Sequence, residues 1–327
     1  MKLAPRRDVL RLLTGAAALS ALAQGARAQA WPARPVRIIV PFQPGGSTDI
    51  FARLAAQKLT EHFGKQFYVE NIAGATGNVG TAQAARAAAD GYTLLIAFSS
   101  YVVNPTLFAK LAFDPDKDFA PVTLAVASLN VIIVNPSLPA RDLKELVALI
   151  KANPGKYSYA TGGVGTQSHL LGEMLRLSLG LDIVHVPFNG AAPAVASAIA
   201  GHTPIALATV ASAAQALEAK QLRALAVASK KRSQLLTDTP TTAEAGYPQI
   251  EGDSWVGLLA PAGTPREIIG ALRDEIASVL ALPDVKERLP ALGFEVVGST
   301  SEEFAARIKA ETEIWGKVVR AANIKAD

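Results

Sequence analysis

Short apolar runs alternate with helix-like runs along almost the whole chain, and this alternation constrains the fold more than any other feature. Val36–Val40 and Asn130–Val134 are almost continuously apolar, as expected of strands buried on both faces of a mostly parallel sheet. Thr48–His62 instead repeats apolar residues with helical spacing, and polar residues occupy its other side. The pattern predicts an α/β protein.

The chain length of 327 residues favours two domains over one. No Pro/Ser-rich linker or internal repeat separates two domains in series. We therefore expect two α/β lobes built from discontinuous segments, with residues 31–127 and 229–327 in lobe 1 and residues 128–228 in lobe 2. The two crossings between the lobes form a hinge. The last helix is expected over Ser301–Ala321, with Ser301 as its cap.

Residues 1–30 have the pattern of a signal peptide. A basic start with the pair Arg6-Arg7 precedes the apolar run Leu12–Ala23, and small residues follow, ending in Ala26-Arg27-Ala28 or Ala28-Gln29-Ala30. The apolar run is shorter than the roughly 20 residues of a membrane-spanning helix. We expect cleavage near residue 28 or 30 and a periplasmic protein. The arginine pair fits the twin-arginine export route, and general export is the alternative.

The net positive charge of the chain lies in this signal segment. Residues 1–29 carry five of the 32 Lys and Arg residues and one of the 28 Asp and Glu residues, which leaves 27 of each in the rest of the chain. A balanced charge without a basic stripe predicts no nucleic-acid partner. The sequence has no cysteine, which excludes disulfides and thiolate metal sites.

No motif predicts catalysis or a cofactor. A G-x-S-x-G nucleophile elbow is absent from the sequence, and Ser168 and His169 are adjacent, so on a helix they point in different directions. Gly74–Gly80 is glycine-rich but matches neither nucleotide-binding pattern. Asp114–Asp118 begins like a calcium loop but has Phe119 where glycine is required. With its histidines scattered, the chain is expected to be no enzyme and to bind no metal or cofactor.

Three glycine turns, each between a strand and a helix, point instead to a binding site. They are Pro41–Asp49, Thr161–Ser168 and Pro187–Pro193. In the first turn, Gly45 and Gly46 allow close backbone approach to a ligand, and Ser47 or Thr48 caps the helix. Free N–H groups and the positive end of the helix dipole suit a carboxylate, and turns after strands in an α/β sheet share one crevice. The alternative is that each is an ordinary capped turn.

These turns and several further segments resemble the Bug/TctC family, the extracytoplasmic receptors of tripartite tricarboxylate transporters. The resemblance covers nearly all of the chain after the signal segment. Besides the first turn, it rests on Glu70–Gly80, Ala89–Leu95, Asn104–Leu107, Gly163–Glu173, Val186–Gly190 and Trp255–Pro265. It implies a two-lobed periplasmic-binding-protein fold of type II, with two hinge crossings, which closes on a small organic acid without any catalytic residue or metal.

The resemblance also implies the ligand-binding residues, because family members hold one carboxylate through backbone N–H groups, hydroxyls and bridging waters of these turns. In lobe 1 the matching residues are Phe42, Gly46, Ser47, Thr48, Asp49, Ala73, Gly74, Ser99 and Ser100. In lobe 2 they are Gly165, Thr166, Gln167, Ser168, His169, Phe188, Asn189 and Gly190.

One segment departs from the family pattern. Many relatives carry Asp, often followed by Asn, where this chain has Ala208 and Thr209. An Asp could pair with a ligand ammonium, whereas Ala208 cannot and Thr209 offers only a neutral hydroxyl. We therefore expect a dicarboxylate, tricarboxylate or aromatic carboxylate that lacks a free amino group.

The expected partners follow from the same resemblance. A monomeric receptor would deliver its ligand to the membrane components of a tripartite tricarboxylate transporter. One alternative is a receptor that signals to a membrane sensor kinase, and a less favoured one is an enzyme on the same scaffold.

Overall fold

The computed structural model describes residues 31–321 and 324–326, and the predicted signal segment lies outside them. The described strands are β1 (Val36–Val40), β2 (Phe67–Asn71), β3 (Thr93–Phe98), β4 (Phe119–Val134), β5 (Ser158–Thr161), β6 (Val184–Pro187), β7 (Ile205–Thr209), β8 (Arg223–Val227), β9 (Asp253–Pro261) and β10 (Glu295–Val296). The helices are α2 (Ser47–Phe63), α3 (Asn78–Ala85), α4 (Asn104–Leu107), α5 (Leu143–Ala152), α6 (Gln167–Leu179), α7 (Ala191–Ile199), α8 (Val210–Glu218), α9 (Arg266–Ala281), α10 (Pro283–Ala291) and α11 (Ser301–Ala321).

The described strands form one ten-stranded sheet in the order β2-β1-β3-β9-β4-β7-β5-β6, with β8 and β10 paired to β4. The pairs β1–β2, β1–β3, β5–β6 and β5–β7 are parallel. Strands β4 and β9 run antiparallel to each other and to their other neighbours. The sheet is therefore mixed rather than mostly parallel, because one long strand leaves lobe 1 and the other returns to it.

Helices cover both faces of the sheet, which explains the continuous apolar runs of the sequence. In β1, Ile38 faces the core built with α2 and α9, and Ile39 faces the core built with α3 and α11. In β4, Ile132 packs with α5 and α6, and Ile133 packs with α7 and α8. Alternate residues of one strand thus enter different cores, and both must be apolar.

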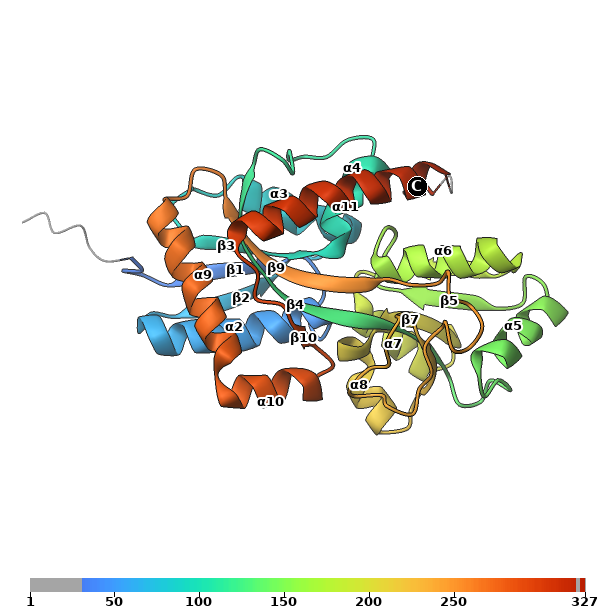
Figure 1. Ribbon diagram of the computed structural model, residues 1–327. Helices are drawn as coiled ribbons and strands as arrows, with labels where there is room; N and C mark the ends of the chain where they lie inside the picture. Colours follow the sequence, from blue (N-terminus) through green and yellow to red (C-terminus); the bar gives the residue numbers. More distant parts are fainter. Residues whose placement is uncertain (1–30, 322–323, 327) are drawn as a thin grey trace, which may run out of the picture.

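The sheet confirms a two-lobed architecture in which β4 belongs to both lobes (Figure 1). Strand β4 pairs with β9 as far as Leu129 and with β7 from Asn130 onward. The predicted lobe boundaries stay a prediction. Ile250 packs in the core of lobe 2, and Thr242 N donates to Val227 O at 2.8 Å. We propose that the second crossing lies at the start of β9, later in the chain than residue 229.

Helix α11 begins with a capping box, but its cap is Thr300 rather than the expected Ser301. Thr300 Oγ1 accepts a hydrogen bond from Glu303 N at 3.1 Å, and Thr300 N donates to Glu303 Oε2 at 2.9 Å. Ser301 instead donates to Val122 O of β4 at 2.7 Å. The Ser301 hydroxyl therefore fixes the helix to the sheet.

Trp255 holds the C-terminal helix α11 against strand β9. Its side chain is fully buried and packs edge-to-face on Phe304, with ring centroids 5.3 Å apart. The indole Nε1 donates to Glu311 Oε2 at 2.7 Å, and Arg307 donates to Glu311 Oε1 at 2.7 Å. One aromatic contact and one charge-assisted hydrogen bond thus hold α11 on β9.

We expect Trp255→Phe to lower the free energy of unfolding by about 2 kcal/mol, because it removes the donor to a partly buried carboxylate and shrinks a packed side chain. Urea denaturation measures the change. Ile314→Ala on the same helix is the control: Ile314 is 55% exposed, and its loss should change the free energy by less than about 0.5 kcal/mol. Equal effects of the two substitutions would contradict the assigned role of Trp255.

Candidate functional site

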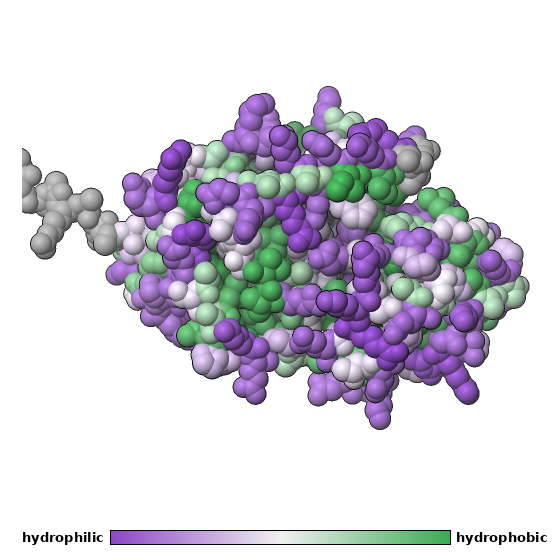
Figure 2. Space-filling model, in the orientation of Figure 1, coloured by the Kyte–Doolittle hydropathy of each residue, from purple (hydrophilic) through white to green (hydrophobic). Residues whose placement is uncertain are grey.

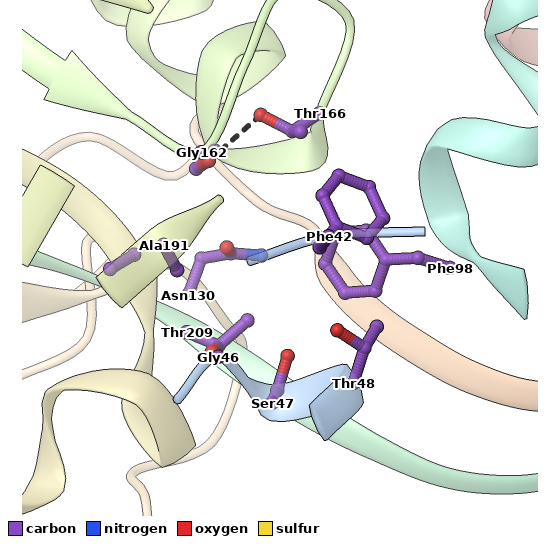
Figure 3. Close-up of a pocket in the computed structure, with 12 residues that line it drawn as sticks. Phe42, Gly46, Ser47, Thr48, Phe98, Asn130, Gly162, Thr166, Ala191 and Thr209 are labelled. Carbon is purple, nitrogen blue, oxygen red and sulfur yellow. Dashed lines mark hydrogen bonds between the residues drawn. The ribbon is translucent and has the colours of Figure 1, made fainter. Parts of the chain in front are cut away.

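A cavity between the two lobes encloses about 380 Å³ of empty space, part of it open to solvent. It is lined by Phe42, Gly46, Ser47, Thr48, Phe98, Asn130, Gly162, Thr166, Ser168, Ala191, Ala208 and Thr209. In Figure 3, Ser47 and Thr48 lie on one side of the cavity and Thr166 and Gly162 on the opposite side. Both lobes therefore contribute to the wall.

The first turn brings the start of α2 to the cavity. Gly45 has φ +87°, a left-handed conformation that favours glycine. The cap of α2 is Gly46, which has no side-chain bond, so the expected cap at Ser47 or Thr48 is wrong. Ser212 of lobe 2 supplies the missing acceptor instead, because Ser47 N donates to Ser212 Oγ at 3.0 Å.

Asp49 is buried beside this turn but does not line the cavity. Its carboxylate accepts hydrogen bonds from Gly45 N at 3.0 Å, Arg53 Nε at 2.9 Å and Asn71 Nδ2 at 2.9 Å. Burial opposes the charged form of Asp49, but the bonds from Arg53, Gly45 and Asn71 outweigh it and hold the pKa below its ordinary value. Asp49 is thus an ionised residue that orders the turn.

The second turn ends at Thr166, which caps α6. Thr166 Oγ1 donates to Gly163 O at 2.7 Å, accepts from His169 N and lies 3.0 Å from Ser168 Oγ. Gly165 has φ +80°, and a Cβ there would lie 2.3 Å from Leu107 Cδ2 of lobe 1. Only glycine allows the two lobes to approach so closely at this point.

Two stacked histidines, His169 and His185, contact the second turn on its side away from the cavity. His169 Nδ1 accepts a hydrogen bond from Gly165 N at 3.0 Å, which requires that this nitrogen carry no proton. The ring stacks on His185 at a centroid distance of 4.0 Å, and His185 Nε2 lies 2.7 Å from Thr161 Oγ1. His169 therefore positions the backbone, and Ser168 bonds Thr166 instead of the imidazole.

Burial keeps both imidazoles neutral. Desolvation lowers the pKa of His169 to about 4, and desolvation together with the neighbouring His169 lowers the pKa of His185 to about 3. Glu173 faces the pair, but its carboxylate is bonded to Tyr159 Oη at 2.7 Å and to Arg176 Nη2 at 2.7 Å. Neutral imidazole is the form that can accept from Gly165.

The third turn and α8 complete the contact between the lobes. Gly190, with φ +140°, caps α7, and Gln43 N of lobe 1 donates to Asn189 O at 3.1 Å. Thr209 caps α8, and its Oγ1 accepts from Ser212 N at 3.2 Å and lies 2.7 Å from Ser212 Oγ. The predicted residue Thr209 thus lines the cavity and also caps α8.

The structure brings eight of the predicted ligand-binding residues to the cavity wall. They are Phe42, Gly46, Ser47, Thr48, Thr166, Ser168, Ala208 and Thr209. Eleven predicted residues do not line it. They are Asp49, Ala73, Gly74, Ser99, Ser100, Gly165, Gln167, His169, Phe188, Asn189 and Gly190. Ser100 lines a smaller neighbouring pocket, from which Phe42 and Phe98 separate the main cavity.

Four lining residues were missed by the sequence analysis. They are Phe98, Asn130, Gly162 and Ala191. Gly162 and Ala191 lie inside the second and third turns, and Phe98 directly precedes the predicted Ser99. Asn130 is the only amide in the apolar segment 129–134. A single polar residue in a buried strand could have indicated a site residue.

The cavity wall contains no Lys, Arg, His, Asp or Glu among the residues that the structure describes. Within the same residues, no three His, Cys, Asp or Glu side chains are grouped to hold a metal ion. The polar groups available at the wall are hydroxyls, one amide and the starts of α2, α6 and α7. This wall can solvate an anion through hydrogen-bond donors but offers no pair of groups for proton transfer.

Comparison with known sequences identifies similar proteins. The model of the tripartite tricarboxylate transporter family receptor, TctC, matches residues 51–324. A UPF0065 protein from the tcbD-tcbE intergenic region of Pseudomonas sp. strain P51 is 39% identical over 313 residues, covering 94% of this chain and 93% of that protein. Protein BugT of Bordetella pertussis strain Tohama I is 36% identical over 310 residues, covering 94% of this chain and 95% of that protein.

Three solved structures of similar fold are 32–34% identical to this chain, and two of them hold a ligand. The periplasmic binding protein BugD superposes with TM-score 0.87 at 34% identity, covering 91% of this chain and 100% of that chain. The structure of R. palustris Rpa4515 with adipate superposes with TM-score 0.88 at 33% identity, covering 90% of this chain and 99% of that chain. The structure of MatC from Rhodopseudomonas palustris with bound malate superposes with TM-score 0.84 at 32% identity, covering 88% of this chain and 100% of that chain.

The histidine pair predicts how stability depends on pH. The unfolded chain protonates histidine near pH 6.5, whereas the folded pKa values are about 4 and about 3. Between pH 6.5 and pH 4 the unfolded state binds more protons, so the free energy of unfolding should fall as pH falls, by about 2–4 kcal/mol. The stabilisation is complete above pH 6.5.

Denaturant unfolding across this pH window tests the effect. His185→Asn should reduce the slope of the free energy against pH, and His202→Asn, at an exposed position, should leave the slope unchanged. A flat profile for the unmodified protein would contradict the assignment.

The bond between Ser47 and Ser212 predicts an effect on lobe closure. Ser212→Ala removes the acceptor, and we expect the ratio of closed to open molecules to fall roughly fivefold, the equivalent of about 1 kcal/mol. Because the chain has no cysteine, spin labels at Lys65→Cys and Lys151→Cys, both exposed, report the distance between the lobes. Ser278→Ala on α9 serves as the control, and an unchanged distance distribution for Ser212→Ala would remove this bond from the closing contact.

Proposed function

Because the chain belongs to the tripartite tricarboxylate transporter receptor family, TctC, we propose that it captures a small organic carboxylate in the cavity between its lobes and delivers it to the membrane components of such a transporter. Family members are substrate-binding receptors rather than enzymes. The fold and the neutral cavity wall agree with a protein that holds its ligand without altering it.

A single observation carries the proposal. The starts of α2, α6 and α7 meet at one cavity through Ser47, Thr48, Thr166, Ser168 and Ala191. The first N–H groups of a helix have no partner within the helix and lie at the positive end of its dipole. Three such ends directed at one small space favour an anion, and they do so without a cationic side chain.

The solved relatives support a carboxylate as this anion. Rpa4515 is known with adipate and MatC with malate, and both superpose on this chain over most of its length. The proposed contact residues are those of the cavity wall, with hydroxyls from Ser47 and Thr48. The predicted residues behind the wall, such as Asp49 and His169, act by ordering the turns.

The ligand is proposed to lack a free amino group. Ala208 lies in the wall where an acid could accept from an ammonium, and the nearby Thr209 hydroxyl is bonded to Ser212. The Asp49 carboxylate is occupied by Gly45, Arg53 and Asn71. An ammonium would therefore enter the cavity without a counter-charge, which is strongly unfavourable.

A periplasmic location is proposed on the same grounds. Proteins of similar fold include a periplasmic binding protein, and residues 1–30 have the signal pattern, with cleavage proposed near residue 28 or 30. Among the described residues, the longest apolar helices fall short of what a membrane crossing requires. The balanced charge of the remaining chain offers no basic surface for a nucleic acid, and the receptor is proposed to be monomeric.

The proposal is tested by screening organic acids for an increase in melting temperature and by calorimetric titration of those that raise it. Gly46→Val should abolish binding while unfolding stays cooperative. The φ of Gly46 is −84°, so the backbone accepts a side chain. A Cβ would already lie 3.9 Å from Ala191 Cβ of lobe 2, and the further methyl groups would fill the cavity.

Gly270→Val on α9 is the matched control, since a Cβ there has no heavy atom within 4 Å among the described residues. It should bind like the unmodified protein. Unimpaired binding by Gly46→Val would exclude this turn from the site, and enzymatic turnover of a bound acid would contradict the receptor role.

A further inference from the structure

We infer that the cavity selects a carboxylate whose remaining part is uncharged and apolar, a monocarboxylate with an aliphatic or aromatic tail, over a dicarboxylate or an amino acid. The inference rests on the proposed function for its first carboxylate, which the helix starts hold. It concerns the rest of the ligand, and it follows from the hydrogen-bond donors, charges and apolar groups in the parts of the wall away from the helix starts.

The polar groups away from the helix starts are already occupied. Asn130 donates one amide hydrogen to Gly252 O at 3.0 Å and the other to Ser254 Oγ at 3.1 Å. Both amide hydrogens of Asn130 are therefore used, and its oxygen accepts from Ser254 Oγ at 3.3 Å. Asn130 has no hydrogen left to donate to a second carboxylate.

The hydroxyls of Thr209 and Ser212 have at most one hydrogen left to donate to a ligand. Ser212 Oγ accepts from Ser47 N and lies 2.7 Å from Thr209 Oγ1, and Thr209 Oγ1 accepts from Ser212 N. One hydrogen of the pair is used in the bond that joins the two oxygens. At most one neutral O–H remains for the ligand, whereas a carboxylate requires several donors or a cation to replace its hydration.

Among the described residues, the ionised side chains near the wall are already paired and cannot compensate a second charge. Arg53 is bonded to Asp49 and Asn71, and Arg176 is bonded to Glu173. His169 is neutral because its Nδ1 accepts from Gly165. Because each of these groups is bonded within the protein, a buried second carboxylate or an ammonium of the ligand would have no oppositely charged partner.

Phenyl rings form the remaining side of the wall. Phe42 and Phe98 pack edge-to-face with centroids 5.5 Å apart and an interplanar angle of 75°. Figure 3 shows the two rings together at one side of the cavity, opposite Asn130 and Ala191. The methyl groups of Ala191 and Ala208 face the same space. Burial of each CH₂ of a ligand tail in such surroundings favours binding.

Matched pairs of acids test the selection by calorimetric titration of the purified protein. Hexanoate and adipate differ by a terminal carboxylate, benzoate and terephthalate by a second ring carboxylate, and 3-phenylpropanoate and phenylalanine by an ammonium. We expect the first member of each pair to bind at least about tenfold more tightly, which corresponds to about 1.4 kcal/mol. Adipate binding as tightly as hexanoate, or terephthalate as tightly as benzoate, would overturn the inference and leave the proposed function intact.

Binding of no carboxylate at all would instead contradict the proposed function and, with it, this inference. The phenyl wall is tested with Phe98→Ala, which should weaken hexanoate by about tenfold and leave the affinity for acetate, which has no tail, unchanged. Phe98→Leu retains apolar volume and should retain hexanoate binding, which guards against a general loss of folding. Equal weakening of acetate and hexanoate by Phe98→Ala would show that the ring does not contact the tail.

Discussion

The unpaired N–H groups at the starts of buried helices are the constraint on which the rest of this structure depends. Such groups must find acceptors, and here the starts of α2, α6 and α7 are directed into one cavity. Ser47 N is satisfied by Ser212 of the opposite lobe, and His169 N is satisfied by the Thr166 side chain. The others leave a site that prefers an anion, and the neighbouring side chains are arranged to keep the turns in that position.

Two buried groups show how the turns are held. The Asp49 carboxylate accepts from Gly45 in the first turn, and the neutral His169 ring accepts from Gly165 in the second. Neither group lines the cavity. Strand β4, which pairs with β9 in lobe 1 and with β7 in lobe 2, connects the two lobes that carry these turns.

The alternation of strands and helices predicts the α/β architecture, and glycine turns predict the three helix starts, because both depend on local sequence. The antiparallel course of β9 and the bond from Ser47 N to Ser212 Oγ could not be predicted, since both depend on residues far apart in the sequence that meet only in the fold. Resemblance to a family identified segments that surround the site but could not separate Ser168, which lines the cavity, from His169, which supports it from behind. That distinction requires the direction of each side chain.

The most direct test of a carboxylate held by backbone groups is to follow the amide resonances of Thr48, Ser168 and Ala191 by nuclear magnetic resonance during titration with an acid that raises the melting temperature. The account predicts that the three N–H protons move downfield together with one dissociation constant, as they would on bonding to a carboxylate. Saturable binding that leaves these three resonances in place would contradict it.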